Sequence, residues 1–370
     1  MNDRAEQPAL DPYEARLAAL EQRLLAVEAV RGVTSGGKPA RKPGRASATP
    51  GRRSVTNQIE RFGLIGAWVI VVIIFGIVMP DVFLSWLNFS TIFSSQAVLV
   101  VLTLGLLIPL TAGDFDLSVA STLTLSAMTL TVLNAQYHWD VIPAVAVALA
   151  AGVVIGFING AIVLFFRIHS LIVTLGVGTF INGIILWISD SQTIAGVSFD
   201  LVNWVIVTRV LGISLTFYYA VFLCLVIWYC FEYTTIGRRL LFVGRGREVA
   251  RLSGIRVDRV RLGSFVISST IAAGAGVLYA GMTGSADPTS GLQLLLPAFA
   301  AAFLGATSIV PGRFNPWGSF FGVYFLVTGI TALTMLGVNT LVQNLFYGGG
   351  LVIAVALSQL VRKRQPQNFS

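Results

Sequence analysis

The sequence predicts an all-α, polytopic integral membrane protein with about ten transmembrane helices, some of them short or interrupted. Of its 370 residues, 55% are hydrophobic and only 11% are charged, whereas soluble domains carry about 25% charged residues. Apolar runs of roughly the 18 residues that cross a bilayer recur between short blocks of cations. This composition excludes a soluble globular enzyme. Two cysteines cannot form a disulfide framework, and no Cys/His cluster has the spacing of metal ligands, so we expect no metal site.

The apolar runs define the expected spans in chain order. They cover residues 64–84, 96–112, 118–134, 141–166, 170–188, 213–232, 263–281, 292–307, 317–336 and 340–361. Helix-breaking backbone at membrane depth is tolerated only where protein or a water-filled cavity surrounds it. Clustered Gly and amide side chains at 174–183 therefore favour an interrupted helix that lines a cavity. A lone glycine instead favours close packing between helices.

The placement of the cations predicts the orientation. Eleven Lys or Arg residues lie in 1–61, eight in 234–262 and three in 362–364. With the N-terminus in the cytoplasm, 24 of the 25 cations fall inside and Arg209 alone lies outside, as the positive-inside rule favours. We expect a multi-pass membrane protein with both termini cytoplasmic. The net charge of +8 then reports topology and attraction to anionic lipid, not a nucleic-acid partner.

Four parts are expected along the chain. They are a cytoplasmic amphipathic or short coiled-coil helix over 1–31, a basic disordered linker over 32–61, a transmembrane domain over 62–361 that includes a cytoplasmic segment over 234–262, and a cytoplasmic tail over 362–370. Apolar residues at alternating spacings of three and four from Leu10 to Val27 predict the first helix. No apolar run begins before Phe62, so we expect no cleavable signal peptide.

One nucleotide-binding pattern occurs and is rejected. Gly32-Val-Thr-Ser-Gly-Gly-Lys38 has the spacing of a phosphate-binding loop, but Pro39 stands where Ser or Thr must reach Mg²⁺. No predicted strand precedes it. We therefore expect no cofactor on this chain.

Two acids, Asp114 and Asp116, lie at the mouth of a predicted span. Acids at this position are costly unless they are hydrated or paired. Asp116 or Ser118 can cap the helix that follows, so we expect both acids to serve helix geometry. No acid lies clearly at mid-membrane, which disfavours an ion-coupled secondary carrier.

The segment 234–262 carries eight arginines against Glu248 and Asp258 and is too polar to enter lipid. Within it, Gly246 to Ile255 predicts one short helix. Val249 and Leu252 share a face of that helix, Arg247 and Arg251 are i,i+4 neighbours, Glu248 can reach Arg251, and Gly254 fits a left-handed cap with Ile255 folded back toward Val249. A basic loop lying on lipid headgroups is the alternative. A capped helix with an apolar edge favours docking to a protein.

Four stretches resemble the permeases of ribose/xylose/galactose-type ABC importers. They are Gly113-Asp-Phe-Asp-Leu-Ser-Val119, Leu171-Ile-Val-Thr-Leu-Gly176, Glu248-Val-Ala-Arg-Leu-Ser-Gly-Ile255 and Phe303-Leu-Gly-Ala-Thr-Ser308 with the glycines that follow it. The resemblance covers roughly residues 60–361. Gly246, Val249 and Ala306 depart from the residues usual in that family, and none of them touches the Arg-Leu-Ser-Gly-Ile core.

The resemblance implies an importer subunit of the bacterial cytoplasmic (inner) membrane that moves a sugar by alternating access. Its partners would be a second permease copy, a cytoplasmic ABC ATPase that binds ATP and Mg²⁺, and a periplasmic or lipid-anchored sugar-binding protein. The implied site residues fall in three groups: ATPase coupling by Arg247, Glu248, Val249, Arg251, Leu252, Ser253 and Gly254; a structural or pathway motif of Gly113, Asp114, Asp116, Leu117 and Ser118; and a substrate pathway with Thr174, Thr179, Phe180 and Asn182.

Three alternatives to a sugar importer subunit stay open. A permease for nucleosides or branched-chain amino acids is the nearest, because those families share related motifs. An ion-coupled carrier and a membrane-embedded enzyme are the others. The sequence offers neither a mid-membrane acid for the former nor a His–acid or Cys–His pair for the latter.

Overall fold

The fold was analysed in a computed structural model, which describes residues 22, 23, 26, 50–338, 342, 345, 348, 349 and 352. The chain divides into two compact units, Met1–Ser54 and Val55–Ser370. All elements described below belong to the second unit, apart from the first residues of α2. The predicted helix in 1–31, residues 32–49 of the predicted linker and the last span, 340–361, lie almost wholly outside the described residues. The rest of the linker predicted over 32–61, residues 50–61, is not irregular but forms the beginning of α2.

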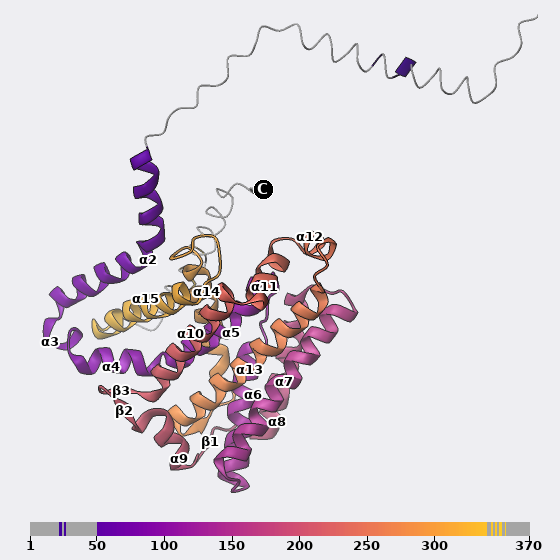
Figure 1. Cartoon of the computed structure of the whole chain (residues 1–370). Coiled ribbons are helices and arrows are strands. Elements are labelled where there is room, and N and C mark those ends of the chain that lie inside the picture. The colour runs from indigo at the N-terminus through magenta and orange to yellow at the C-terminus, as the bar shows by residue number, and fades with distance from the viewer. Residues whose placement is uncertain are drawn as a thin grey trace, which may run out of the picture. The chain divides into compact units, whose positions relative to one another are not determined.

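The described chain is mostly helical (Figure 1). Its elements are α2 (Pro50–Val78), α3 (Pro80–Phe83), α4 (Trp86–Ser95), α5 (Ala97–Thr111), α6 (Val119–Thr131), the π-helix Val132–Gln136, α7 (Val141–Phe165), α8 (Ser170–Ser189), β1 (Ile194–Ala195), α9 (Phe199–Val202), the π-helix Asn203–Val207, β2 (Arg209–Val210), β3 (Ile213–Ser214), α10 (Leu215–Tyr233), α11 (Thr235–Arg245), α12 (Arg247–Leu252), α13 (Val257–Thr283), β4 (Ser285–Ala286), α14 (Ser290–Gly305) and α15 (Pro316–Met335). The strands form two short antiparallel pairs, β1 with β4 and β2 with β3.

The polytopic helical class is confirmed. Among the described residues, six helices are long and apolar enough to cross a membrane: α2 from Arg61, α7, α8, α10, α13 and α15. The helices α4 and α5 form a seventh candidate span that is bent by 40°. The helices α6 and α14 have 13 and 16 residues and are shorter than a span. The count of ten therefore stays a prediction.

The helix α8 corrects one expectation. It runs without a break from Ser170 to Ser189, so the interruption predicted at 174–183 is wrong. Gly176 and Gly183 have no heavy atom within 4 Å of where a Cβ would stand. Gly178 packs against Ser118 and Ser121 at the start of α6. In an apolar setting an unbroken helix satisfies its own backbone hydrogen bonds, and this outweighs the weak helix propensity of glycine.

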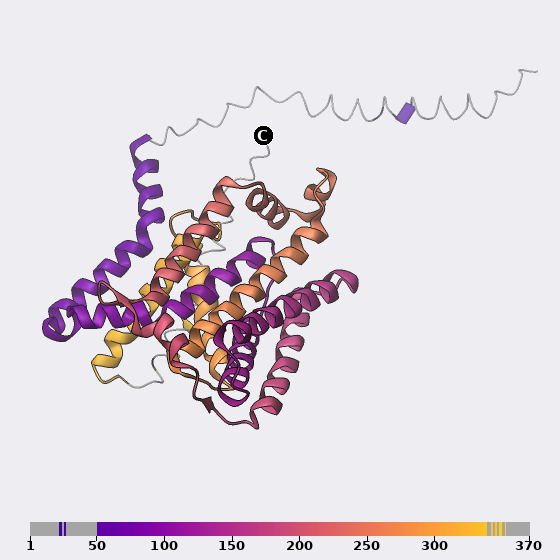
Figure 2. The same cartoon turned by 60° about the horizontal axis from the view of Figure 1, so that its bottom comes forward.

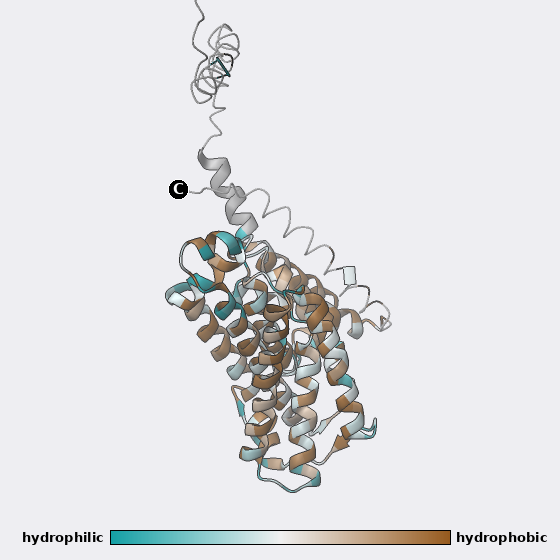
Figure 3. Ribbon diagram, turned by 90° about the vertical axis from the view of Figure 1, so that its right-hand side faces the viewer, coloured by the Kyte–Doolittle hydropathy of each residue, from teal (hydrophilic) through white to brown (hydrophobic). Residues whose placement is uncertain are grey.

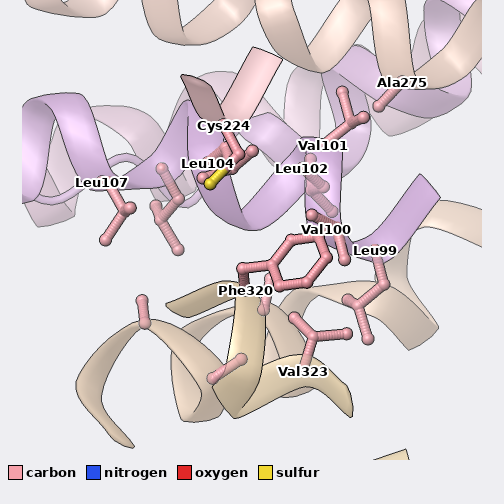
Figure 4. Packing of buried hydrophobic residues seen from close by; sticks show 14 of the residues in the cluster. Leu99, Val100, Val101, Leu102, Leu104, Leu107, Cys224, Ala275, Phe320 and Val323 are labelled. Carbon is pink, nitrogen blue, oxygen red and sulfur yellow. The ribbon is translucent and has the colours of Figure 1, made fainter. Parts of the chain in front are cut away.

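The core is built around α5. Every residue of α5 is buried, and the helix packs against α10, α13, α14 and α15. Figure 4 shows Leu99, Val100 and Leu102 of α5 beside Phe320 and Val323 of α15. A helix apolar on all sides is the expected signature of this central position.

Glycines let α7 and α13 approach closely, and the two helices lie side by side in Figures 1 and 2. Gly152, Gly156 and Gly160 lie one helical turn apart on α7, and a Cβ on any of them would meet α13. This is the close packing expected of small residues on membrane helices.

The connecting segments gather at two ends of the bundle. One end holds the C-terminus of α5, the N-termini of α6, α8 and α13, the helices α11 and α12, and the loop 306–315. The other end holds residues 194–214 and 284–287. Of the arginines from Arg61 to Arg313, only Arg209 lies at this second end. Figure 3 shows hydrophobic residues over the middle of the helices and hydrophilic ones toward the ends. The charge segregation predicted from the sequence is therefore present in the fold.

Candidate functional site

Residues 234–262, called the coupling segment below, form two helices and the start of a third. The Thr234 side chain caps α11 by accepting a hydrogen bond from the Gly237 N–H. Gly246 is the single residue between α11 and α12. On α12, Ala250 is fully buried, while Val249 is 45% and Leu252 88% exposed. The predicted short helix is confirmed, and its two larger apolar side chains point away from the protein's own core.

The end of α12 is a Schellman cap. Gly254 has φ +80°, its N–H binds the Arg251 carbonyl at 3.0 Å, and the Ile255 N–H binds the Ala250 carbonyl at 3.0 Å. The predicted left-handed cap is therefore confirmed. The predicted partner of Ile255 is wrong: Ile255 packs on the cluster of Val243, Ala250 and Val257. Ala250 lies on the inward face of the helix, whereas Val249 is turned toward its exposed side.

The polar residues of α12 are mostly exposed. Arg251 has two acidic neighbours, Glu248 at 3.7 Å and Asp258 at 3.8 Å, and all three side chains are more than half exposed. Such exposed pairs add little to stability. The Ser253 hydroxyl donates to the Val249 carbonyl at 2.9 Å. These groups are available to a partner.

The loop 112–118 between α5 and α6, called the motif loop below, begins with a second Schellman cap. Gly113 has φ +79°, its N–H binds Leu110 at 3.1 Å, and the Asp114 N–H binds the Pro109 carbonyl at 2.9 Å. A left-handed residue here favours glycine. The cap turns the chain sharply enough to bring Asp114 back under the coupling segment.

Asp114 is an ion-pair centre and does not cap a helix. Its side chain is 1% exposed. Arg247 Nη2 donates to its Oδ1 at 2.9 Å and to the Gly113 carbonyl at 2.9 Å. Arg261 donates from Nε to Oδ2 and from Nη2 to Oδ1, both at 2.7 Å. The predicted geometric role thus takes another form, because two arginines neutralise the buried charge. Arg247, predicted on the ATPase-facing side, instead faces the motif loop.

Asp116 is fully buried and differs from Asp114 in its partners. Its Oδ1 accepts the Ser118 N–H at 3.1 Å and the Ser118 hydroxyl at 2.6 Å. These bonds hold the turn before α6, but Ser118 is the N-cap residue and no side chain caps the helix there, so the predicted capping by Asp116 or Ser118 is wrong. Asn159 of α7 donates to the Ser118 oxygen at 2.7 Å. Burial raises the pKa of Asp116 to about 6, and the hydrogen bonds from Ser118 oppose this rise. Asp116 Oδ2 has no hydrogen-bond partner among the described residues.

The first turn of α8 holds the motif loop from its other side. Ser170 Oγ accepts the Phe115 N–H at 3.0 Å, and Thr174 Oγ1 accepts the Leu117 N–H at 3.0 Å. Thr174 is fully buried and also donates to the Ser170 carbonyl at 2.9 Å. Its hydroxyl is therefore engaged within the protein, and its predicted place on a substrate pathway stays a prediction.

The other predicted pathway residues lie further along α8. Thr179 is exposed and donates to the Leu175 carbonyl at 2.9 Å. Phe180 is 70% exposed, and Asn182 is half-buried with its side-chain oxygen unpaired among the described residues. Their role in transport stays a prediction.

A cavity of about 640 Å³ opens beside the motif loop. Its lining residues are Leu110, Gly113, Asp114, Phe115, Leu117, Leu171, Gly244, Leu292, Leu295, Leu296, Phe299, Phe303 and Phe314. The rings of Phe115 and Phe299 stack at 6.4 Å with an angle of 18°. The cavity therefore has aromatic and leucine walls and a carboxylate already neutralised by arginine.

Sequence reasoning missed four residues of this site. Arg261 and Gly244 belong to the arginine-rich segment, but nothing marked them as facing the motif loop. Asn159 and Phe299 lie inside predicted spans. A signal did exist for Arg261: an acid at a span mouth needs a cation at the same end of the bundle, and the eight arginines of 234–262 were the candidates.

No metal site is built from the described residues, where no three His, Cys, Asp or Glu side chains come together. His169 instead accepts the Leu171 N–H at the start of α8. Cys224 is buried in the core around α5, and Cys230 is half-buried.

Comparison with known proteins gives one family and several curated relatives. The family described as the permease component of branched-chain amino acid transport systems matches residues 88–355. The D-allose transport system permease protein of Escherichia coli K12 is 31% identical over 304 residues, covering 82% of this chain and 93% of the relative. The L-arabinose ABC transporter permease protein of Azospirillum brasilense is 28% identical over 317 residues, covering 85% and 92%. The ribose import permease protein of E. coli K12 is 28% identical over 272 residues, covering 72% and 84%.

No solved structure matches the chain. The range matched by the family contains the motif loop, the coupling segment and the cavity. The site therefore lies within the part of the chain that the family describes.

Proposed function

The chain belongs to the family of permease components of branched-chain amino acid transport systems, and we propose that the solute it moves is a monosaccharide. It is the permease subunit of an ABC importer, a transport subunit and not an enzyme, as its motifs predicted. It is a multi-pass membrane protein. Such a permease works with an ATPase and a substrate-binding protein.

The observation that carries the choice of solute is the similarity to the D-allose permease, which covers 82% of this chain and 93% of that relative. The relatives named for L-arabinose and ribose point to the same class of solute. A monosaccharide is neutral and rich in hydroxyl groups, so its pathway needs hydrogen-bonding and aromatic side chains more than charges. The description of the family favours a branched-chain amino acid as the second candidate.

We infer that α12 is the helix that docks to the ATPase. Leu252 is 88% exposed and Val249 45% exposed on a helix whose opposite side is fixed by the buried Ala250. Two exposed apolar anchors on a capped helix fit the helix-in-groove mode of recognition. Arg251 and Glu248 beside them supply polar contacts. ATP and Mg²⁺ would bind to the ATPase and not to this chain.

The proposed orientation in the membrane rests on where the arginines lie. The end of the bundle that carries α12 also carries every arginine from Arg61 to Arg313 except Arg209. We propose that this end faces the cytoplasm and that both termini lie on that side. A second permease copy would complete the pathway, and movement of the two α12 helices during the ATPase cycle would drive alternating access.

The solute class is tested by deleting the gene and measuring uptake of labelled compounds by intact cells. Labelled D-allose, L-arabinose, D-ribose and L-leucine form the panel, and a plasmid copy of the gene is the control. We expect the loss of uptake of at least one sugar, restored by the plasmid, with leucine uptake unchanged. Loss of leucine uptake alone would assign the second candidate.

A further inference from the structure

The two arginines of α12 face different parts of the protein. Arg247 contacts the motif loop at Asp114 and Gly113, each at 2.9 Å. Arg251, one turn later, has its acidic neighbours in the coupling segment itself, at 3.7 and 3.8 Å. Docking to a partner and contact with the membrane domain are therefore carried by different side chains of one six-residue helix.

The motif loop connects this contact to the cavity. Gly113, Asp114 and Phe115 are all part of the cavity wall. Phe115 stacks on Phe299 of α14, which also lines the cavity, with ring centres 6.4 Å apart. Asp114 and Phe115 are neighbours in the sequence, so a movement of Asp114 with Arg247 also shifts the ring of Phe115 against Phe299.

The two arginines on Asp114 are not equivalent. Arg261 binds both carboxylate oxygens and is 12% exposed, whereas Arg247 binds one oxygen and is 42% exposed. The contact of Arg247 is thus the weaker and more solvated one. When Arg247 leaves, Arg261 still neutralises the buried carboxylate, so the large cost of an unpaired buried charge does not arise.

The backbone on either side of α12 would let this helix move while α11 stays fixed on α5. Gly244, in the last turn of α11, packs against the Thr111 carbonyl so closely that a side chain has no room. This contact fixes α11 on the end of α5. Gly246 alone then connects α11 to α12, and the cap at Gly254 ends α12 before α13.

We propose that Arg247 is a positioning residue that transmits the movement of α12 to the cavity wall by binding and releasing Asp114 during the transport cycle. This inference rests on the proposed docking of the ATPase to α12. Arg247 acts through Asp114 and Phe115 and does not touch the transported solute. Contiguous side-chain networks of this kind alter the coupling between sites by about 2- to 30-fold when one member is changed.

The test uses the complete transporter, with this permease, its ATPase and its binding protein, reconstituted in vesicles. The variants are Arg247→Gln, Arg247→Lys and the matched control Arg251→Gln, which removes the same charge from the same helix without touching the motif loop. Three quantities are measured for each: the ATPase retained on purification, the solute transported per ATP hydrolysed, and the melting temperature in detergent.

We expect Arg247→Gln to retain the ATPase and its melting temperature and to transport about 2- to 30-fold less solute per ATP. Arg247→Lys should fall between it and the wild type, because an ammonium keeps the charge but does not reproduce the guanidinium geometry that places Nη2 on both Asp114 Oδ1 and the Gly113 carbonyl. Arg251→Gln, at a residue of the proposed docking surface, should instead weaken retention of the ATPase.

Two results would overturn the inference. One is a wild-type transport ratio in Arg247→Gln, or in Arg247→Lys if the former fails to fold. The other is loss of the ATPase from Arg247→Gln, which would place Arg247 on the docking surface and leave the proposed function intact. A fourth variant, Leu252→Asp, at the exposed apolar side chain of α12, distinguishes failure of the proposed docking, because this variant would then keep its ATPase.

Discussion

Arg261 grips Asp114 with two hydrogen bonds of 2.7 Å, from Nε to Oδ2 and from Nη2 to Oδ1. The contact joins the second turn of α13 to the motif loop after α5, although 147 positions separate the two residues. Asp116, two residues further on, is equally buried but has no ion-pair partner among the described residues. Two arginines therefore neutralise the charge of Asp114, whereas no cation of the described chain pairs with Asp116. Substitution of each acid measures this difference.

Asp114→Asn should destabilise the folded protein strongly. It leaves Arg261, at 12% exposure, without its carboxylate, and removing one partner of a buried pair costs about 3–5 kcal/mol. Thermal unfolding in detergent, followed by size-exclusion chromatography, measures the effect. Asp81→Asn, at an exposed acid in α3, is the control and should leave the melting temperature unchanged. An unchanged melting temperature in Asp114→Asn would contradict the ion-pair role.

Asp116→Asn should give a pH-dependent gain in stability. Burial raises the pKa of Asp116 from 3.8 to about 6, so the folded state binds its proton more tightly than the unfolded state. The stability that Asp116 contributes is therefore complete below about pH 4 and is lost as the pH rises through about 6. Asparagine has no such titration. The melting temperature of Asp116→Asn minus that of the wild type should increase from pH 4 to pH 7, and a constant difference would refute the raised pKa.

Gly254→Val should impair the docking of the ATPase. The residue at 254 has φ +80°, where a β-branched side chain is strained, although no neighbouring atom would clash with it. The cap of α12 and the placement of Leu252 should both suffer. Gly246→Ala at the other end of α12 is the matched control, because its φ of −175° suits any residue. Co-purification of the ATPase should fall for Gly254→Val and stay normal for Gly246→Ala. Equal retention by both variants would argue against a role for the cap.

Topology reporters test the orientation. A fusion after Arg364 should report the cytoplasm, and a fusion near Asp200 in α9 should report the outside, because the cations gather at the opposite end from α9. An external signal at Arg364 would reverse the assignment of the two ends.

Much of the fold could be predicted from the sequence because its helices depend on patterns among neighbouring residues. Apolar runs located a helix in each of the first nine predicted segments, and the spacing around Gly254 predicted both α12 and its cap. Glycine misled the prediction in α8, where the clustered residues at 174–183 suggested a break. In an apolar setting, an unbroken helix satisfies its own backbone hydrogen bonds. Gly178 leaves room for the start of α6 to pack closely against α8.

The site was less predictable because its contacts join distant parts of the chain. The sequence singled out Asp114 and Arg247 separately, but no local pattern showed that their side chains meet at 2.9 Å. Thr174 looked like a polar pathway residue, and only the fold revealed that its hydroxyl holds the Leu117 N–H. The count of spans could not be predicted firmly either, since α6 and α14 are shorter than a bilayer crossing.

The most direct test of an ABC permease that docks its ATPase through α12 is the amount of ATPase retained by Leu252→Asp on affinity purification. Leu252 is 88% exposed, so the substitution should leave the melting temperature of the permease unchanged. Loss of such an anchor costs about 2 kcal/mol or more, so association with the ATPase should weaken roughly 30-fold or more, and uptake should fall with it. Full retention of the ATPase and full uptake by a folded Leu252→Asp variant would contradict α12 as the docking helix.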